Sequence, residues 1–177
     1  MTPRELEEYK ALRATIRERG TARVWIFAAS LGLWTGLVIA TASTIPTPLG
    51  ALLPLLLLAG AFEAIFSLHT GVERIGRYIQ VFYEGGEADA TSSRRWEQTA
   101  MALGRRTRKG GSDPLFAAYY LLAASFNIIP SLLIGPIPVE WAVVGVAHLL
   151  FIGRVLIARS QATSQRARDL EQFQQLK

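Results

Sequence analysis

The chain of 177 residues contains no cysteine. Without a thiol it can form no disulfide bond, bind no metal through thiolates and use no cysteine nucleophile. Histidine is also scarce, with two residues, and the sequence has no nucleophile elbow, no paired carboxylate site and no His-Glu metal motif. These absences weigh against an enzyme without excluding one, and no cofactor is expected.

Charge is nearly absent from four long apolar stretches. Each approaches the roughly 20 residues that a helix needs to cross a hydrocarbon core about 30 Å thick. Four buried helices of a soluble protein are the alternative, but soluble helices of this length carry a polar face, and these stretches have almost none. The sequence therefore predicts four membrane spans, over residues 24–45, 49–70, 114–134 and 139–157.

Positive charge is absent from the two short loops at residues 46–48 and 135–138. All 19 lysines and arginines lie instead within residues 4–23, 74–109 and 154–177. Because cytoplasmic loops of membrane proteins collect lysine and arginine, this distribution predicts that both termini and the central segment are cytoplasmic. We expect a multi-pass integral membrane protein, in a bacterial inner membrane.

The net charge of +5 raises the question of a nucleic-acid partner. The basic residues, however, cluster next to the ends of the predicted spans. At that position they face anionic lipid headgroups, and each contributes about 1 kcal/mol close to the membrane surface. The lipid bilayer accounts for the basic residues, and no nucleic-acid partner is expected.

Amphipathic or basic segments flank the spans. Residues 2–21 repeat apolar side chains at three- and four-residue spacing, which predicts a cytoplasmic amphipathic helix that bends at Gly20 into the first span. The second span should continue as an interfacial helix to residue 84, and a basic loop or helix should follow over 86–112. The fourth span should run into a helical tail over 158–177.

These elements together predict an all-α fold. The two outer loops are three or four residues long and rich in proline, so each should join two antiparallel neighbours. We expect a four-span transmembrane helix bundle, built as two antiparallel helical hairpins with cytoplasmic amphipathic helices. The whole chain, residues 1–177, should form one integral membrane domain.

A stripe of small residues lies along the first span, one residue in every four. Small side chains at this spacing let a second helix approach closely, and the two glycines form a GxxxG motif. The partner could be a neighbouring span of the same chain or a second protein chain, and we favour the neighbouring span. The stripe consists of Ala28, Gly32, Gly36 and Ala40.

Polar residues within the predicted spans are candidates for function, and five of them stand out by their depth. At 1.5 Å per residue, Glu63 and Tyr120 lie about 10 Å from the inner boundary and Arg154 lies nearer to it. Glu63 could therefore pair with Arg154 or accept a hydrogen bond from Tyr120. Asn127 and His148 lie about 10 to 12 Å from the outer face and form a second candidate pair.

A polar ladder marks the inner end of the second span. His69, Glu73 and Arg77 follow one another at four-residue spacing, and the acid and the arginine can form an ion pair. Aromatic residues around them favour an interfacial helix anchored by its rings. His69 and Glu73 alone make a weak metal site. His69 and His148 differ in depth by about 15 Å, so both cannot ligate one haem iron.

The sequence favours a non-enzymatic scaffold or accessory subunit of a membrane protein assembly, with a protein partner or as a homo-oligomer. The alternative is a small oligomeric transporter or ion channel with Glu63 in its pathway. A membrane-embedded enzyme ranks third. A lone acid without a second carboxylate nearby favours Glu63 as a structural contact between helices over Glu63 as a proton or ion site.

Overall fold

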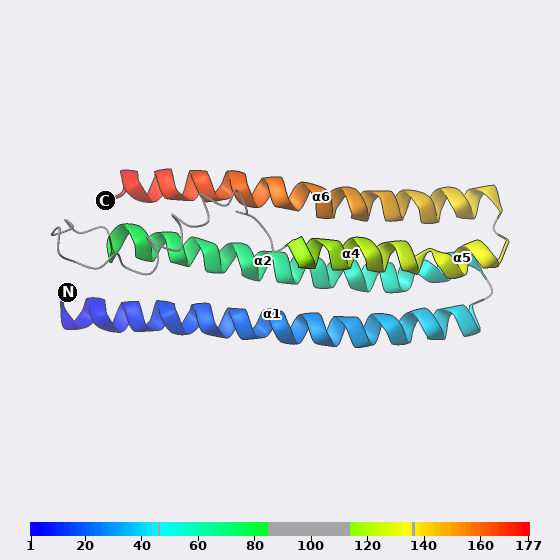
Figure 1. The fold of residues 1–177 in the computed structure, drawn as a ribbon, viewed down its shortest axis with the longest axis horizontal. Helices are drawn as coiled ribbons and strands as arrows, with labels where there is room; N and C mark the ends of the chain where they lie inside the picture. Colours follow the sequence, from blue (N-terminus) through cyan, green and yellow to red (C-terminus); the bar gives the residue numbers. More distant parts are fainter. Residues whose placement is uncertain (46, 85–113, 136) are drawn as a thin grey trace. The chain divides into compact units, whose positions relative to one another are not determined.

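A computed structural model describes residues 1–45, 47–84, 114–135 and 137–177 (Figure 1). The predicted basic segment over 86–112 lies outside the described residues. Every regular element in the described ranges is helical, as the sequence predicts. These elements are α1 (Pro3–Thr44), the 3-10 helix η1 (Pro48–Ala51), α2 (Leu52–Phe82), α4 (Pro114–Asn127), α5 (Ile129–Leu133) and α6 (Pro138–Gln175).

Four helical stretches are long and apolar enough to cross a membrane, which confirms this part of the sequence prediction. Large apolar side chains such as Leu56, Leu149 and Leu150 are exposed on their outer sides, as expected for helices surrounded by lipid. The pairing into hairpins and the cytoplasmic side stay predictions. The four stretches are Pro3–Thr44, Pro48–Phe82, Phe116–Leu133 and Pro138–Gln175.

The first helix is longer than either element predicted for this part of the chain. The segments expected over 2–21 and 24–45 form the single helix α1, which continues through Gly20. A glycine inside a helix costs only about 1 kcal/mol relative to alanine, so it need not end one. The helix begins with a reciprocal cap. The backbone N–H of Glu5 donates to Thr2 Oγ1 at 3.3 Å, and that of Thr2 donates to Glu5 Oε2 at 2.6 Å.

Prolines set several helix boundaries. Pro48 opens η1 and Pro138 opens α6, where a missing N–H costs nothing because the first turn has no acceptor for it. The helical chain breaks at Ile128, between α4 and α5, two residues before Pro130. Pro130 cannot donate to the carbonyl four residues earlier and its ring crowds that carbonyl. Gly135 has φ +71°, in the left-handed region that favours glycine.

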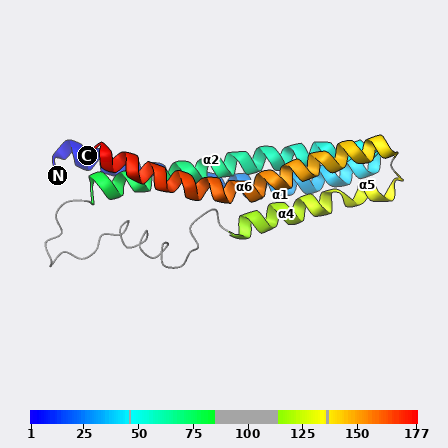
Figure 2. The ribbon, with the colours of Figure 1, turned by 90° about the horizontal axis from the view of Figure 1, so that it is seen from above.

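The chain divides into two compact units, and α1, α2 and α6 each contribute residues to both. Unit 1 consists of Met1–Ala22, Ser67–Gly111 and Ser160–Lys177. Unit 2 consists of Arg23–Phe66 and Ser112–Arg159. Figure 2 shows the same helices in a second view.

The core of unit 2 lies between α2, α4 and α6. Leu58, Tyr120 and Ala124 are fully buried there. The ring of Phe62 packs edge-on against that of Tyr120, with 5.2 Å between centroids, and against that of Phe151 at 6.1 Å. Ala123 and Ala124 on α4 belong to the same buried cluster as Phe62 and Phe151, so small and large side chains together fill the space between the helices.

Candidate functional site

The first of the predicted polar contacts is an ion pair in unit 2. Arg154 Nε lies 2.7 Å from Glu63 Oε1, and Arg154 Nη2 donates to Glu63 Oε2 at 2.8 Å. The guanidinium also lies 5.0 Å from the ring centroid of Phe66 and 5.7 Å from that of Phe62. A two-pronged bond of this kind, flanked by ring faces, fixes α6 to α2 and leaves neither charge alone.

The Glu63 carboxylate is paired but not fully buried in unit 2. Its side chain is 50% exposed, and that of Arg154 is 33% exposed. The alternative bond from Tyr120 to Glu63 is not formed. Tyr120 lies fully buried against Phe62 and Phe151, because its ring fills the space between the helices.

The second polar contact of unit 2 is a buried network around Asn127, which is 1% exposed. Its Nδ2 donates to the backbone oxygen of Ala51 at 2.8 Å and lies 3.1 Å from His148 Nε2. Its Oδ1 accepts from Trp34 Nε1 at 3.3 Å. One side chain on α4 thus contacts α1, α6 and the end of η1.

The network fixes the amide orientation and the histidine tautomer. His148 Nδ1 lies 2.8 Å from the backbone oxygen of Val144, which can only accept, so Nδ1 carries the proton and Nε2 accepts from Asn127. Turning the Asn127 amide round would set its oxygen against the Ala51 carbonyl and its NH₂ against the Trp34 N–H. In the observed orientation, both amide hydrogens of Asn127 have an acceptor and its oxygen has a donor.

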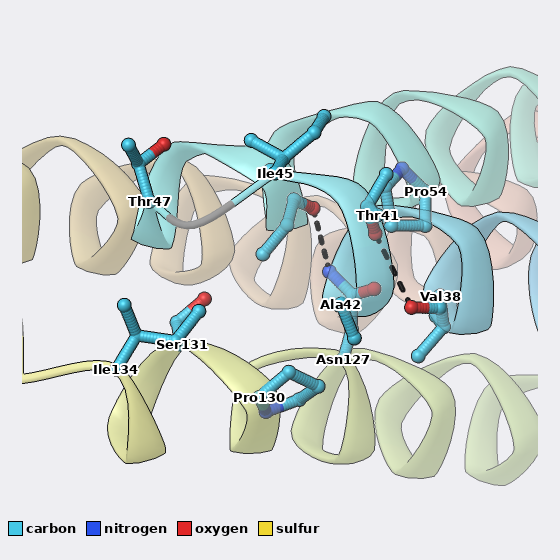
Figure 3. Close-up of a pocket in the computed structure, with 12 residues that line it drawn as sticks. Val38, Thr41, Ala42, Ile45, Thr47, Pro54, Asn127, Pro130, Ser131 and Ile134 are labelled. Carbon is cyan, nitrogen blue, oxygen red and sulfur yellow. Dashed lines mark hydrogen bonds between the residues drawn. The ribbon is translucent and has the colours of Figure 1, made fainter.

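A small pocket lies beside Asn127 (Figure 3). Thr41, Ser131 and Pro130 line it, among others, and its volume is about 10 Å³, room for about one water molecule. Ser131 Oγ donates to the backbone oxygen of Pro48 at 3.0 Å, which ties α5 to η1. The pocket is therefore a packing gap between helices, too small for an organic ligand.

Within the described part of the chain, no neighbouring helix lies against the small-residue stripe, so the expected contact with another span is not among the contacts that the structure shows. Its four residues, Ala28 to Ala40 at every fourth position, are exposed. A Cβ added at Gly32 or Gly36 would meet no atom within 4 Å in the described structure. The reason is that α1 packs through its rings instead: Phe27 lies 4.7 Å from Tyr119, centroid to centroid.

Unit 1 holds a buried ion pair that joins α2 to the tail of α6. The side chain of Arg77 is 2% exposed, and its Nη2 donates to Asp169 Oδ2 at 2.7 Å. Arg74 Nε donates to the same oxygen at 3.2 Å. Arg77 is the last residue of the predicted series His69, Glu73 and Arg77. Its nearest partner is Asp169 on α6, however, and not Glu73 on its own helix.

Glu73 lies at the centre of the remaining contacts of the ladder. Its Oε1 lies 3.6 Å from His69 Nε2, its Oε2 lies 3.7 Å from Arg77 Nη1, and Arg166 donates to Oε1. Arg166 and Asp169 are not among the residues that the sequence pattern predicts for a site. Their opposite charges three residues apart were visible, but no pattern in the tail indicates which helix they face.

The described residues bring together no group of three or more histidine and carboxylate side chains that could hold a metal ion. The ion pairs Glu63–Arg154, Arg77–Asp169 and Glu73–Arg166 each join two helices, and this arrangement can bind helices together. In comparisons with models of protein families, with curated proteins and with solved structures, the chain matches none.

Replacing Asn127 with alanine should destabilise unit 2. It leaves the Trp34 N–H, the Ala51 carbonyl and His148 without their partner, and an interhelical hydrogen bond within a membrane contributes about 0.6 kcal/mol on average. We expect a loss of roughly 1–3 kcal/mol, measured by unfolding in detergent with circular dichroism. Ser125→Ala is the control, since Ser125 bonds only to its own helix, at Leu121. Equal losses for both variants would contradict the network.

Asp169→Asn should destabilise unit 1 strongly. It leaves the buried Arg77 guanidinium with only Glu73, and breaking a buried ion pair from one side costs about 3–5 kcal/mol. Glu171→Gln, at an exposed position two residues further on, should change stability by less than about 0.5 kcal/mol. Thermal unfolding of the two variants measures the difference, and a wild-type midpoint for Asp169→Asn would rule out this role of the pair.

Proposed function

We propose that the protein is a non-enzymatic membrane scaffold or accessory subunit, which binds a partner chain or a second copy of itself through its spanning helices. The observation that carries this proposal is the exposed stripe from Ala28 to Ala40 on α1, where a Cβ added at either glycine would meet no atom of the described residues within 4 Å. In lipid, helices associate through close backbone contact, and an exposed GxxxG motif offers a surface for it.

The polar contacts of unit 2 support a structural role. Glu63 is held by Arg154 through both carboxylate oxygens, and Asn127 is bonded to Trp34, Ala51 and His148. An ion path needs polar groups that can exchange partners with the ion, whereas these groups hold neighbouring helices together. A scaffold needs such a rigid frame to present its outer surface.

The proposal also includes the orientation of the protein in the membrane. Both termini and the segment over 86–112 face the cytoplasm, in a bacterial inner membrane, because every lysine and arginine lies toward that end of the spans and none lies in the two short loops at the other end. The arginines there contact anionic lipid headgroups, whose attraction weakens as salt screens it.

One observation favours the second candidate, a small oligomeric transporter or channel. The Glu63 carboxylate is half exposed on the surface of unit 2. In an oligomer that buried this surface, the carboxylates of several copies could line a shared path. Ionisable groups that face such a cavity are frequent in transporters.

Gly32→Leu and Gly36→Leu test the scaffold directly. A Cβ at either position would meet no described atom within 4 Å, and both positions are exposed, so both variants should fold with wild-type thermal stability. They should nevertheless lose a co-purifying partner or the homo-oligomer, since the larger side chain separates two backbones. Gly60→Leu, at an exposed and equally open position on α2, is the control. Unchanged partners and oligomeric state in both stripe variants would end the proposal.

A flux assay in proteoliposomes separates the two candidates. As a scaffold, the wild-type protein and Glu63→Gln should both give the ion and solute leak of empty vesicles, because Glu63 serves only to bind Arg154. A flux that the wild-type protein supports and Glu63→Gln abolishes would instead favour the transporter. Arg154→Lys, which keeps the charge but loses the two-pronged bond, distinguishes loss of the ion pair from loss of the acid.

A further inference from the structure

A groove in unit 1, with a volume of about 800 Å³, lies between the start of α1 and the end of α2. Four aromatic residues line it: Tyr9, Tyr78, Phe82 and Tyr83. Three glutamates line it as well. We call it the aryl groove. Neither the ion pairs described above nor the proposed scaffold uses it.

The rings of the aryl groove are held at an angle to one another. The ring centroids of Tyr78 and Phe82 lie 4.7 Å apart, with an interplanar angle of 35°. Those of Tyr78 and Tyr83 lie 6.0 Å apart at 63°, and those of Tyr9 and Tyr83 lie 5.6 Å apart at 53°. Phe173, from α6, packs edge-on against Tyr78 and Phe82. Rings set at these angles form the walls of a concave site.

The groove carries more negative than positive charge. Glu84 lies 3.5 Å from Arg13, and Glu5 lies 3.9 Å from the N-terminal amine. Glu8 instead accepts a hydrogen bond from the Tyr78 hydroxyl at 3.0 Å, and within the described part of the chain no lysine, arginine or histidine forms an ion pair with it. The Glu8 charge is therefore bonded to phenol and not neutralised by a cation.

The Glu8 carboxylate also affects the pKa of the Tyr83 hydroxyl. Partial burial, followed by the hydrogen bond to Glu8 and the Glu8 charge, raises the pKa of Tyr83 to about 12. The direction of this pKa shift shows that the surroundings of Tyr83 disfavour a further negative charge beside Glu8.

The chain already places one cation against a ring of this groove. The Arg13 guanidinium carbon lies 5.2 Å from the Tyr9 ring centroid, within the range of a cation–π contact. Arg13 occupies the Tyr9 side together with Glu84. The side formed by Tyr78, Phe82 and Glu8 offers the same combination of rings and carboxylate.

We propose that the aryl groove binds an organic cation of the quaternary ammonium class, with the cation against the rings of Tyr78, Phe82 and Tyr83 and with Glu8 as its counter-charge. A quaternary ammonium has no N–H to donate, so it needs ring faces and a nearby negative charge but no acceptor geometry. The ligand is either a free small solute or the trimethylammonium group of a lipid headgroup. This proposal is independent of the scaffold function.

The first experiment uses the full-length protein in nanodiscs of phosphatidylglycerol, which lack any quaternary ammonium. Tetramethylammonium and choline are titrated while tyrosine fluorescence and heat are recorded. Both should bind, and 3,3-dimethylbutanol, which has the shape of choline without its charge, should bind at least about fivefold more weakly. Equal affinity for the neutral compound would overturn the proposal, since the groove would then bind by shape alone.

Variants identify the site. Glu8→Gln keeps an acceptor for Tyr78 but removes the charge, and should weaken choline binding at least about fivefold. Tyr78→Phe keeps the ring and should retain binding. Glu7→Gln, one residue away and paired with Lys10, should bind like the wild type. Wild-type affinity in Glu8→Gln, or an equal loss in Glu7→Gln, would overturn the proposal.

A final arm distinguishes the two sources of the ligand. Nanodiscs that contain phosphocholine lipid are compared with nanodiscs that contain phosphoethanolamine lipid at the same fraction. A lipid ligand should compete with tetramethylammonium only in the phosphocholine discs, whereas a free solute should bind equally in both. If neither soluble cation nor the phosphocholine lipid alters the tyrosine fluorescence or releases heat, the aryl groove is not a cation site.

Discussion

The structure depends on one constraint, which is that a polar group inside an apolar helix bundle must find its partner within the protein. An unpaired amide in such surroundings costs several kcal/mol. Asn127 meets this constraint with both amide hydrogens and its oxygen bonded, and it joins α1, η1 and α6 in doing so. Apolar packing brings the helices of unit 2 together, but apolar contacts tolerate sliding and rotation. The directional bonds of Asn127 remove that freedom and select one arrangement.

Unit 1 meets the same constraint with charges. Arg77 is buried, and Asp169 and Glu73 approach it from two helices. A buried ion pair contributes little net stability, because desolvation offsets most of the attraction. Its effect is on specificity, since any register of the α6 tail that separates Asp169 from Arg77 leaves a buried charge alone. The tail is therefore held in one register against α2, which also brings Phe173 against Tyr78 and Phe82 at the aryl groove.

Hydropathy predicts the lengths of the spans, and helix rise predicts the depth of each residue. The other features depend on which side of each helix faces its neighbours. Span lengths follow from composition, and depth alone makes Glu63 a candidate partner for Arg154 and Asn127 for His148, the contacts that the structure contains. Depth says nothing about which side of a helix packs. A uniformly apolar helix has no polar face to indicate it, so the exposure of Glu63 and of the stripe could not be foreseen. In the tail of α6 the sequence is misleading in the opposite way. Arg166 and Asp169 carry charges that are usual on a solvent-exposed helix, yet both contact α2.

Helix α1 packs within unit 2 through one face and exposes its small-residue stripe on the opposite face. At 3.6 residues per turn, the residues through which α1 packs in unit 2 (Phe27, Ser30, Trp34 and Thr41) share one face, and the stripe from Ala28 to Ala40 is centred roughly 170° away. The rings fill the space toward α4, so the small residues are left on the opposite side. Residues four apart follow one ridge of the helix, and this ridge suits a right-handed crossing near about −40°. One helix can therefore hold its own bundle and receive a partner without either contact disturbing the other.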